Sequence, residues 1–183
     1  GLVRGFADCY SDVDIIVFLG SKRRGLRESI KKVGVDEQKN SKVEIDLEVH
    51  HLKDFTKRRL DEIAKWDYST YRIVYDPGGR VKELLKKKMR TPKKYWIERI
   101  VVCAEYVGWY CCPRREGNAT LAETWIERGD FISAHYCVNY AIELLLEIIY
   151  TLNNEFLPPP KWRIFYSYNL SWLPHDYRRL LEE

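Results

Sequence analysis

The segment from Asp12 to Leu19 constrains the fold more than any other part of the chain. It reads Asp-Val-Asp-Ile-Ile-Val-Phe-Leu and is followed by Gly20. A short run of this kind, rich in β-branched residues and almost continuously apolar, predicts a strand that is buried on both faces. Asp12 and Asp14 are two residues apart, so their side chains leave the same face of a strand. The sequence therefore predicts a sheet that presents two neighbouring carboxylates.

A second strand is predicted at residues 43–49, where apolar and polar residues alternate strictly. One face of this strand carries only acids, namely Glu44, Asp46 and Glu48. Helices are predicted at residues 23–33, with Gly34 as the stop, at 51–66 and at 80–90, and a short strand is predicted at 71–75. The segment Asp76-Pro-Gly-Gly then reads as a turn.

Strand signals almost vanish after Pro92, and apolar residues recur every three or four positions instead. This pattern predicts helices at residues 96–110, 119–128 and 130–153 and a last helix after Pro174, with Pro158 to Pro160 ending the third of them. We therefore expect an α+β protein with a small mixed β-sheet domain at residues 1–91 and an α-helical bundle at residues 92–183.

Composition and charge exclude several classes of protein. Of the 183 residues, 45% are hydrophobic and 32% are charged, which is a globular composition. No uninterrupted apolar run approaches the roughly 18 to 20 residues of a membrane span, and the first residues do not resemble a signal peptide. The five cysteines lack paired Cys-x-x-Cys spacings, which favours buried thiols in a reducing compartment. We expect a cytoplasmic protein with no membrane partner.

Positive charge gives little reason to expect a nucleic-acid partner. Lys and Arg exceed Asp and Glu by 31 to 27, a net charge of +4. Lys86, Lys87 and Lys88, followed by Arg90, form a basic run, but charge runs at helix ends usually face solvent and complement the helix dipole.

The acids of the two predicted strands suit a magnesium site. Asp12 and Asp14 would repel each other without a cation, and a third acid on a neighbouring strand would complete a set of oxygen ligands. Asp46 is the preferred third ligand because it is central to its strand, although Glu44 and Glu48 stay open as alternatives. Upstream, a glycine turn with Gly1, Arg4 and Gly5, followed by Ser11, could present N–H groups and positive charge to phosphate oxygens.

These residues resemble the nucleotidyltransferase superfamily that includes DNA polymerase beta and the antibiotic nucleotidyltransferases. Its signature is a Gly-Ser or Gly-Gly pair, a spacer, Asp-x-Asp on a strand, and a third acid on a neighbouring strand. Arg4-Gly5 and Ser11-Asp12-Val13-Asp14 match this pattern closely, and Asp46 fits the third acid. Further segments resemble the antibiotic-type branch of the superfamily. They are Tyr71 to Gly79 and, in the helical half, Arg128-Gly129-Asp130, Leu152-Asn153 and Pro160-Lys161-Trp162.

One departure from the family pattern lies at the front of the chain. The chain opens Gly1-Leu2 instead of Gly-Ser or Gly-Gly. We therefore expect that Gly1 is the second member of the pair, and that the helix and strand that usually precede it are missing, so that the nucleotidyltransferase domain is truncated at its N-terminus.

The resemblance implies a mechanism and its residues. Two Mg²⁺ ions would bridge a nucleoside triphosphate and the catalytic acids Asp12, Asp14 and Asp46, and Gly1, Arg4, Gly5 and Ser11 would contact the nucleotide. In antibiotic-modifying relatives an acid of the helical half can assist as general base. Glu143 or Asp130 is the candidate here, although Asp130 after Gly129 also reads as a helix N-cap.

The expected function is transfer of a nucleoside monophosphate, AMP from ATP, to a hydroxyl of a small aminoglycoside- or lincosamide-like acceptor. The bundle would bind the acceptor or form a homodimer, since relatives often build the site at a dimer interface. Two alternatives stay open. The acceptor is a protein, as in antitoxin-type nucleotidyltransferases, or the chain is a non-catalytic module that binds a partner. The identity of the acceptor and the choice among ATP, GTP and CTP are not determined by these residues.

Overall fold

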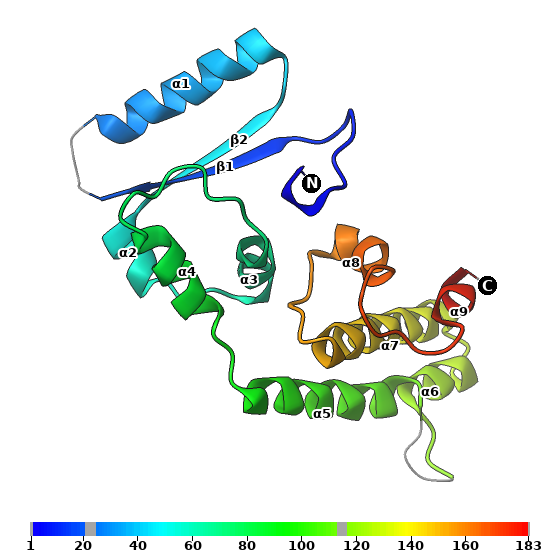
Figure 1. Cartoon of the computed structure of the whole chain (residues 1–183). Coiled ribbons are helices and arrows are strands. Elements are labelled where there is room, and N and C mark those ends of the chain that lie inside the picture. The colour runs from blue at the N-terminus through cyan, green and yellow to red at the C-terminus, as the bar shows by residue number, and fades with distance from the viewer. Residues whose placement is uncertain (1, 21–24, 113–116, 183) are drawn as a thin grey trace. The chain divides into compact units, whose positions relative to one another are not determined.

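The computed structural model describes residues 2–20, 25–112 and 117–182 and shows an α+β protein (Figure 1). The chain divides into two compact units. The first comprises residues 1–61 and 67–90, and the second comprises residues 62–66 and 91–183. The division after Arg90 lies one residue before the boundary that the sequence suggests, and it also assigns five residues of a helix in the first half to the second unit.

The first unit is built on a pair of parallel strands. Its elements are η1 (Leu2–Arg4), β1 (Val13–Leu19), α1 (Leu26–Ser41), β2 (Ile45–His51), α2 (Leu52–Lys57), the C-terminal part of α3 (Glu62–Ser69), and α4 (Arg80–Met89). Parallel strands need a crossover connection, and α1 provides it between β1 and β2. Figure 1 shows α1 on one side of the strand pair and α2 and α4 on the other.

The described part of the sheet differs from the prediction in two respects. It contains two parallel strands and is therefore not mixed. With one neighbouring strand, β1 is not buried on both faces, and Ile15 and Ile16 are 39% and 38% exposed. The alternation predicted for the second strand is confirmed, because Ile45, Leu47 and Val49 are partly or fully buried whereas the acids between them are exposed.

Gly34 does not end the first helix, as the sequence suggested, but lies inside α1. A Cβ atom at this position would approach Cδ2 of Leu47 to 2.6 Å. The glycine therefore permits a close approach of α1 to β2, and the helix continues to a left-handed cap at Lys42, whose φ is 59°. Because Leu47 meets α1, α1 covers the face of the sheet opposite to the acids of β2.

Two further predictions for the first half are wrong. The helix expected at residues 51–66 is two helices, α2 and α3, separated by residues 58–61. Residues 71–75 form no strand, and Val74 is 91% exposed. The helix predicted at residues 80–90 is confirmed as α4, and Asp76 caps its start by accepting hydrogen bonds from the backbone N–H groups of Val81 and Lys82, both at 3.0 Å.

The second unit is helical. It contains the N-terminal part of α3 together with α5 (Lys93–Tyr110), α6 (Leu121–Glu127), α7 (Phe131–Leu152), α8 (Pro160–Ser167) and α9 (Tyr177–Glu182). Thr120 and Glu123 form a capping box at the start of α6. The helix α8 was not predicted, because Pro160 stands at its first turn, where a proline is tolerated, and does not prevent it.

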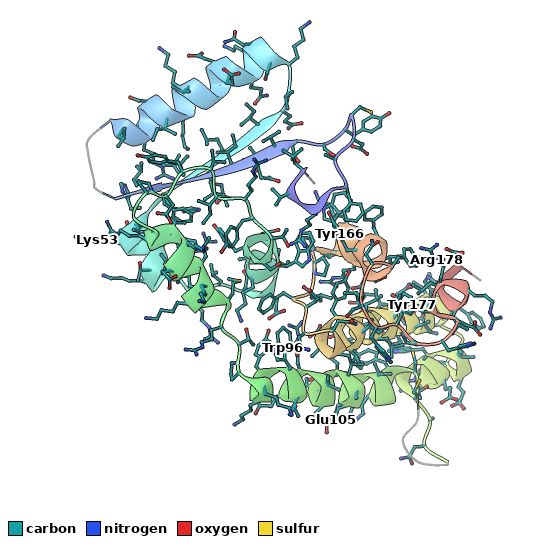
Figure 2. The ribbon with its side chains drawn as sticks, in the orientation of Figure 1. Lys53, Trp96, Glu105, Tyr166, Tyr177 and Arg178 are labelled. Atoms are coloured by element: carbon teal, nitrogen blue, oxygen red, sulfur yellow. The ribbon has the colours of Figure 1, made fainter. Side chains whose placement is uncertain are left out.

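The core of the second unit lies between α5, α7 and the C-terminal segment. Cys103 and Val107 of α5 pack with Leu144 of α7, and Leu146 and Ile149 of α7 pack with Tyr177 of α9. Tyr166 and Tyr177, labelled in Figure 2, belong to α8 and α9. The hydroxyl of Tyr177 donates a hydrogen bond of 2.8 Å to the buried Ser167, which ties α9 to the end of α8.

The helix α7 is apolar almost all round. Of the stripe that its periodicity suggested, Ala134 and Ala141 are buried, whereas Val138, Leu145 and Leu152 are between 42% and 46% exposed. Among the described residues, α7 alone is long and apolar enough to cross a membrane by length and composition. The core helix of a soluble protein meets the same criterion.

Candidate functional site

The acids of the two strands lie on one face of the sheet because of the register of β1 and β2. Asp14 is the direct partner of Asp46, and Ile16 is the partner of Glu48. Residues that are direct partners in adjacent strands project to the same side. Asp14, Asp46 and Glu48 therefore share the face opposite to α1, which we call the acid face.

The backbone pairing of the two strands extends to the residue that precedes β2. The backbone N–H of Val13 donates a hydrogen bond of 2.9 Å to the carbonyl of Glu44. Asp12 and Glu44 are thus held next to each other at the start of the sheet, and both are exposed. The structure places Asp12, Asp14 and Asp46 at the same end of the strand pair.

Glu48 differs from Asp46 because its carboxylate contacts a histidine ring. Its Oε2 atom lies 2.7 Å from Nε2 of His50, which is the next residue on the acid face. The His50 ring also packs against Phe18 and Phe55, with ring centroids 5.9 and 5.5 Å apart. Within the described residues the carboxylate of Asp46 has no hydrogen bond or ion pair, so it is the more accessible of the two acids for a ligand.

Asp67, near the end of α3, is an acid that the sequence analysis missed. Loss of hydration raises the pKa of its carboxyl, the Arg4 guanidinium opposes this effect, and the charges of Asp14, Glu48 and Asp61 raise the pKa further. These interactions place Asp67 within the electrostatic field of the acid face. The only signal in the sequence is an acid between two aromatic residues, Trp66 and Tyr68, in a segment where the predicted helix had already ended.

Beside Asp67, Tyr68 is buried and contributes to the apolar support of the acid face. Burial raises the pKa of its hydroxyl to about 12, and the charge of Glu48 adds to this effect. Its ring lies against Phe55 at a centroid distance of 5.2 Å, and Phe55 lies against Phe18 at 4.8 Å. The acid face is thus bordered by packed aromatic side chains from β1, α2 and α3.

The loop before β1 contains the predicted nucleotide-binding residues. Gly5 has a φ of +79°, a left-handed conformation that favours glycine, and its N–H donates a hydrogen bond to the carbonyl of Leu2 at 3.2 Å. Arg4 donates a hydrogen bond of 3.3 Å to Oγ of Ser69 at the end of α3. Its charge also acts on Asp67, so the structure brings Arg4 into the neighbourhood of the acid face. Gly1 lies outside the described residues.

Ser11 is engaged within its own loop. Its hydroxyl donates a hydrogen bond of 2.9 Å to Oδ1 of Asp8 and accepts one of 3.0 Å from the backbone N–H of Asp8. These bonds define the turn that leads into β1. In this arrangement Ser11 orients the loop before Asp12.

The two candidate bases of the second unit have structural partners. Glu143 of α7 forms an ion pair with Arg163 of α8. Asp130 is the N-cap of α7 and accepts hydrogen bonds from the backbone N–H and the hydroxyl of Ser133, at 2.9 and 2.7 Å, which lower the pKa of its carboxyl. The structure therefore supports the reading of Asp130 as a helix cap.

The acid face offers the right donors for magnesium but not a closed cage. In the ranges 2–20, 25–112 and 117–182, no three His, Cys, Asp or Glu side chains are grouped so that they could hold a metal ion. Magnesium at sites of phosphoryl transfer is usually bound by one or two carboxylates together with substrate phosphates. The paired Asp14 and Asp46 provide two hard oxygen ligands on adjacent strands, which fits that requirement.

Comparison with known proteins adds no assignment. The chain matches no protein-family model, and neither a curated protein sequence nor a solved structure is significantly similar to it.

Proposed function

We propose that the protein is a magnesium-dependent nucleotidyltransferase that transfers AMP from ATP to a hydroxyl of a small acceptor, such as an aminoglycoside- or lincosamide-like compound. The observation that carries this proposal is the register of the sheet, in which Asp14 is the direct partner of Asp46 and Asp12 lies two residues before Asp14. This arrangement agrees with the Asp-x-Asp and third-acid pattern of the superfamily that the sequence resembles.

Asp14 and Asp46 would hold magnesium together with the phosphates of the nucleotide, and Asp12 stands at the same end of the strand pair, two residues before Asp14. Bound magnesium would polarise the acceptor hydroxyl and neutralise the charge that develops on the leaving pyrophosphate. In the reaction the acceptor oxygen forms a bond to the α-phosphorus, and the bond from that phosphorus to the oxygen of the β-phosphate breaks. The hydroxyl proton must pass to a base, and pyrophosphate leaves.

Other residues of the first unit would position the substrate and receive the proton. Arg4, held by Ser69, would supply positive charge for the phosphates. Asp67 is better suited to accept the proton than Asp130, because the pKa of Asp67 is raised whereas that of Asp130 is lowered. A carboxylate with a raised pKa is the stronger base.

Calorimetric titration with a non-hydrolysable ATP analogue, with and without magnesium, tests the proposal. Asp14→Asn should weaken magnesium-dependent binding by at least about tenfold, because it removes a charged ligand beside Asp46. Asp36→Asn is the matched control, since Asp36 is an exposed acid on α1, on the other side of the sheet. If Asp14→Asn and Asp36→Asn both bind the analogue like the unmodified chain, the site is wrongly assigned.

One observation favours a protein acceptor as a second candidate. The helices α5 and α7 expose large apolar side chains, including Trp109 at 64%, Ile132 at 86% and Tyr136 at 69%. Extended exposed apolar surface often marks a site of protein association. A protein acceptor predicts AMP incorporation into a co-purified polypeptide and no turnover of small hydroxylated compounds, whereas a small acceptor predicts the reverse.

A further inference from the structure

A basic cavity that is broadly open to solvent lies in the first unit beside α4. Its volume is about 650 Å³, which is within the usual range of ligand-binding clefts. Four cations line it: Lys82, Lys86, Lys87 and Arg90. Glu83 is the one acid in its lining, so the lining carries a net charge of +3. None of the residues assigned to the acid face lines this cavity.

Positive charge is concentrated in this segment. Residues 80–90 contain six cations and one acid, a net charge of +5, whereas the whole chain carries +4. The remaining 172 residues therefore sum to −1. A cluster of this kind attracts polyanions although the overall charge is small.

The lysines of the run 86–88 have different roles. Lys88 is tethered to α2, because its Nζ donates hydrogen bonds to the carbonyls of Thr56 and Arg58 at 3.1 and 2.6 Å and lies over the Phe55 ring. Loss of hydration and the charges of Arg58 and Lys87 lower the pKa of Lys88. Lys88 thus fixes α4 in place and leaves the neighbouring lysines on the cavity side.

The cations that line the cavity are available to a ligand. In the part of the chain that the structure describes, the side chains of Lys82, Lys86, Lys87 and Arg90 form no ion pair or hydrogen bond. Lys82 and Lys86 lie one helical turn apart, so the positive charges repeat along α4 and do not converge on one point. A repeating row of charges suits a polymer of phosphates better than a single phosphate group.

An aromatic ring, a hydroxyl group and the Met89 side chain also line the cavity. Tyr71 is 40% exposed and lines the cavity together with Ser69. Aromatic rings beside a positively charged groove are the usual platform for the bases of single-stranded nucleic acids. The combination of four cations with an accessible ring in one lining distinguishes this cavity from a charge run that only faces solvent.

We propose that the cavity beside α4 binds single-stranded nucleic acid, with Lys82, Lys86, Lys87 and Arg90 on successive phosphates and Tyr71 stacked on a base. The sequence alone gave little reason to expect such a partner, because it does not show that these residues surround a cavity. The inference concerns binding and does not depend on the proposed transfer reaction.

Fluorescence anisotropy with a labelled RNA of about twelve uridines tests this proposal, because single-strand sites commonly cover about 4 to 16 nucleotides. The salt concentration is varied between about 50 and 200 mM. Replacing Lys82, Lys86 and Lys87 with Gln should reduce the slope of log K against log salt by about 2 and weaken binding about a hundredfold near 0.1 M salt, since each single-strand phosphate contact contributes about 0.7 to the slope.

The matched control removes the same charge from another exposed helix of the first unit. Lys31, Lys32 and Lys39 on α1 are exposed and distant in sequence from the cavity, and their replacement with Gln should leave the slope unchanged. Tyr71→Ala should weaken binding about five- to a hundredfold without changing the slope, because it removes stacking and not charge. Circular dichroism spectra establish that each variant is folded.

Two results would overturn the proposal. In the first, the α1 and α4 triple variants lose affinity equally, which shows attraction to net charge alone. In the second, the RNA does not bind, whereas ATP binds and its affinity falls when Lys82, Lys86 and Lys87 are replaced with Gln. Asp14→Asn should bind the RNA like the unmodified chain, so failure of the nucleotidyltransferase assignment and failure of this inference give different results.

Discussion

Arg99 of α5 should be the most sensitive charged residue of the second unit. Its side chain is 12% exposed, and its guanidinium pairs with the carboxylates of Glu62, at the start of α3, and Glu147, on α7. The bond from Nε of Arg99 to Oε1 of Glu147 is 2.7 Å. Burial alone would lower the pKa of Arg99, but its hydrogen bonds with both glutamates outweigh burial and raise the pKa. Arg99→Met removes the charge and retains much of the apolar stem.

The expected loss follows from the groups left behind. Removing one partner of a buried ion pair costs about 3 to 5 kcal/mol, because the other charge stays buried and unpaired. Glu62 and Glu147 are 27% and 24% exposed, so water solvates them in part. Oε1 of Glu62, however, is already buried without a hydrogen-bond partner. We therefore expect Arg99→Met to lower the free energy of unfolding by about 3 kcal/mol, the low end of that range.

Urea unfolding followed by circular dichroism measures this loss, with Lys94→Met as the control. Lys94 and Glu98 form an ion pair on the same helix, at 3.4 Å, but their side chains are 80% and 61% exposed. An exposed helical pair contributes about 0.3 to 0.5 kcal/mol, so the control should change little. A combined variant, Arg99→Met with Glu62→Gln and Glu147→Gln, should regain part of the stability, since it removes the stranded charges.

Two outcomes would contradict the argument. Arg99→Met could be no less stable than Lys94→Met, which would mean that the buried triad contributes no more than a surface pair. Alternatively, the combined variant could be no more stable than Arg99→Met, which would mean that lost packing, not unpaired charge, causes the effect.

Two further predictions use the pKa shifts. The pKa of Asp67 is raised in the folded state, so protonation favours folding and stability falls as the pH rises from the unfolded value of 3.8 through the folded value. Asp67→Asn should therefore have a higher free energy of unfolding than the unmodified chain at neutral pH, as measured by urea unfolding, and the gain should shrink toward pH 3.8. Equal stability of the two proteins at all pH values would show that burial of the Asp67 carboxylate does not destabilise the fold. Burial raises the pKa of Cys103 to about 12, with Glu147 adding to the effect, whereas Cys9 and Cys112 are exposed. A maleimide at neutral pH should label Cys9 and Cys112 in the folded protein and Cys103 only after unfolding. Mass spectrometry of tryptic peptides would identify the labelled cysteines, and rapid labelling of Cys103 in the folded protein would contradict its burial.

Sequence patterns predicted an element correctly where residues close together in the chain determine it. The alternation in residues 43–49 identified β2, although the strand begins at Ile45, because a half-buried strand imposes a period of two. Asp76-Pro-Gly-Gly marked the start of α4, because the Asp76 carboxylate and the left-handed Gly79 act within a few residues. Asp130 was recognised as a possible cap for the same reason.

Other features escaped the sequence because distant residues decide them. Gly34 reads locally as a helix stop, and only contact with Leu47 explains a glycine inside α1. In α7 the apolar residues surround the helix, so periodicity does not select the face that packs on α5. Asp67 joins the neighbourhood of the acid face because the fold of the first unit brings it within reach of the charges of Arg4, Asp14 and Glu48, which no spacing of residues reveals.

The sequence by itself determined that two acidic strands would be followed by a helical half, because periodicity, glycines, prolines and caps act over short distances. The tertiary structure alone decided that β1 and β2 pair in parallel with Asp14 opposite Asp46, since the register depends on how α1 crosses over and packs on Leu47. It also decided that one basic run becomes the wall of a cavity, because Lys88 is held by α2 while its neighbours remain beside Tyr71. Charge and hydrophobic pattern can be read from the sequence. The folded backbone alone determines which carboxylates lie side by side and which cations lie beside the Tyr71 ring.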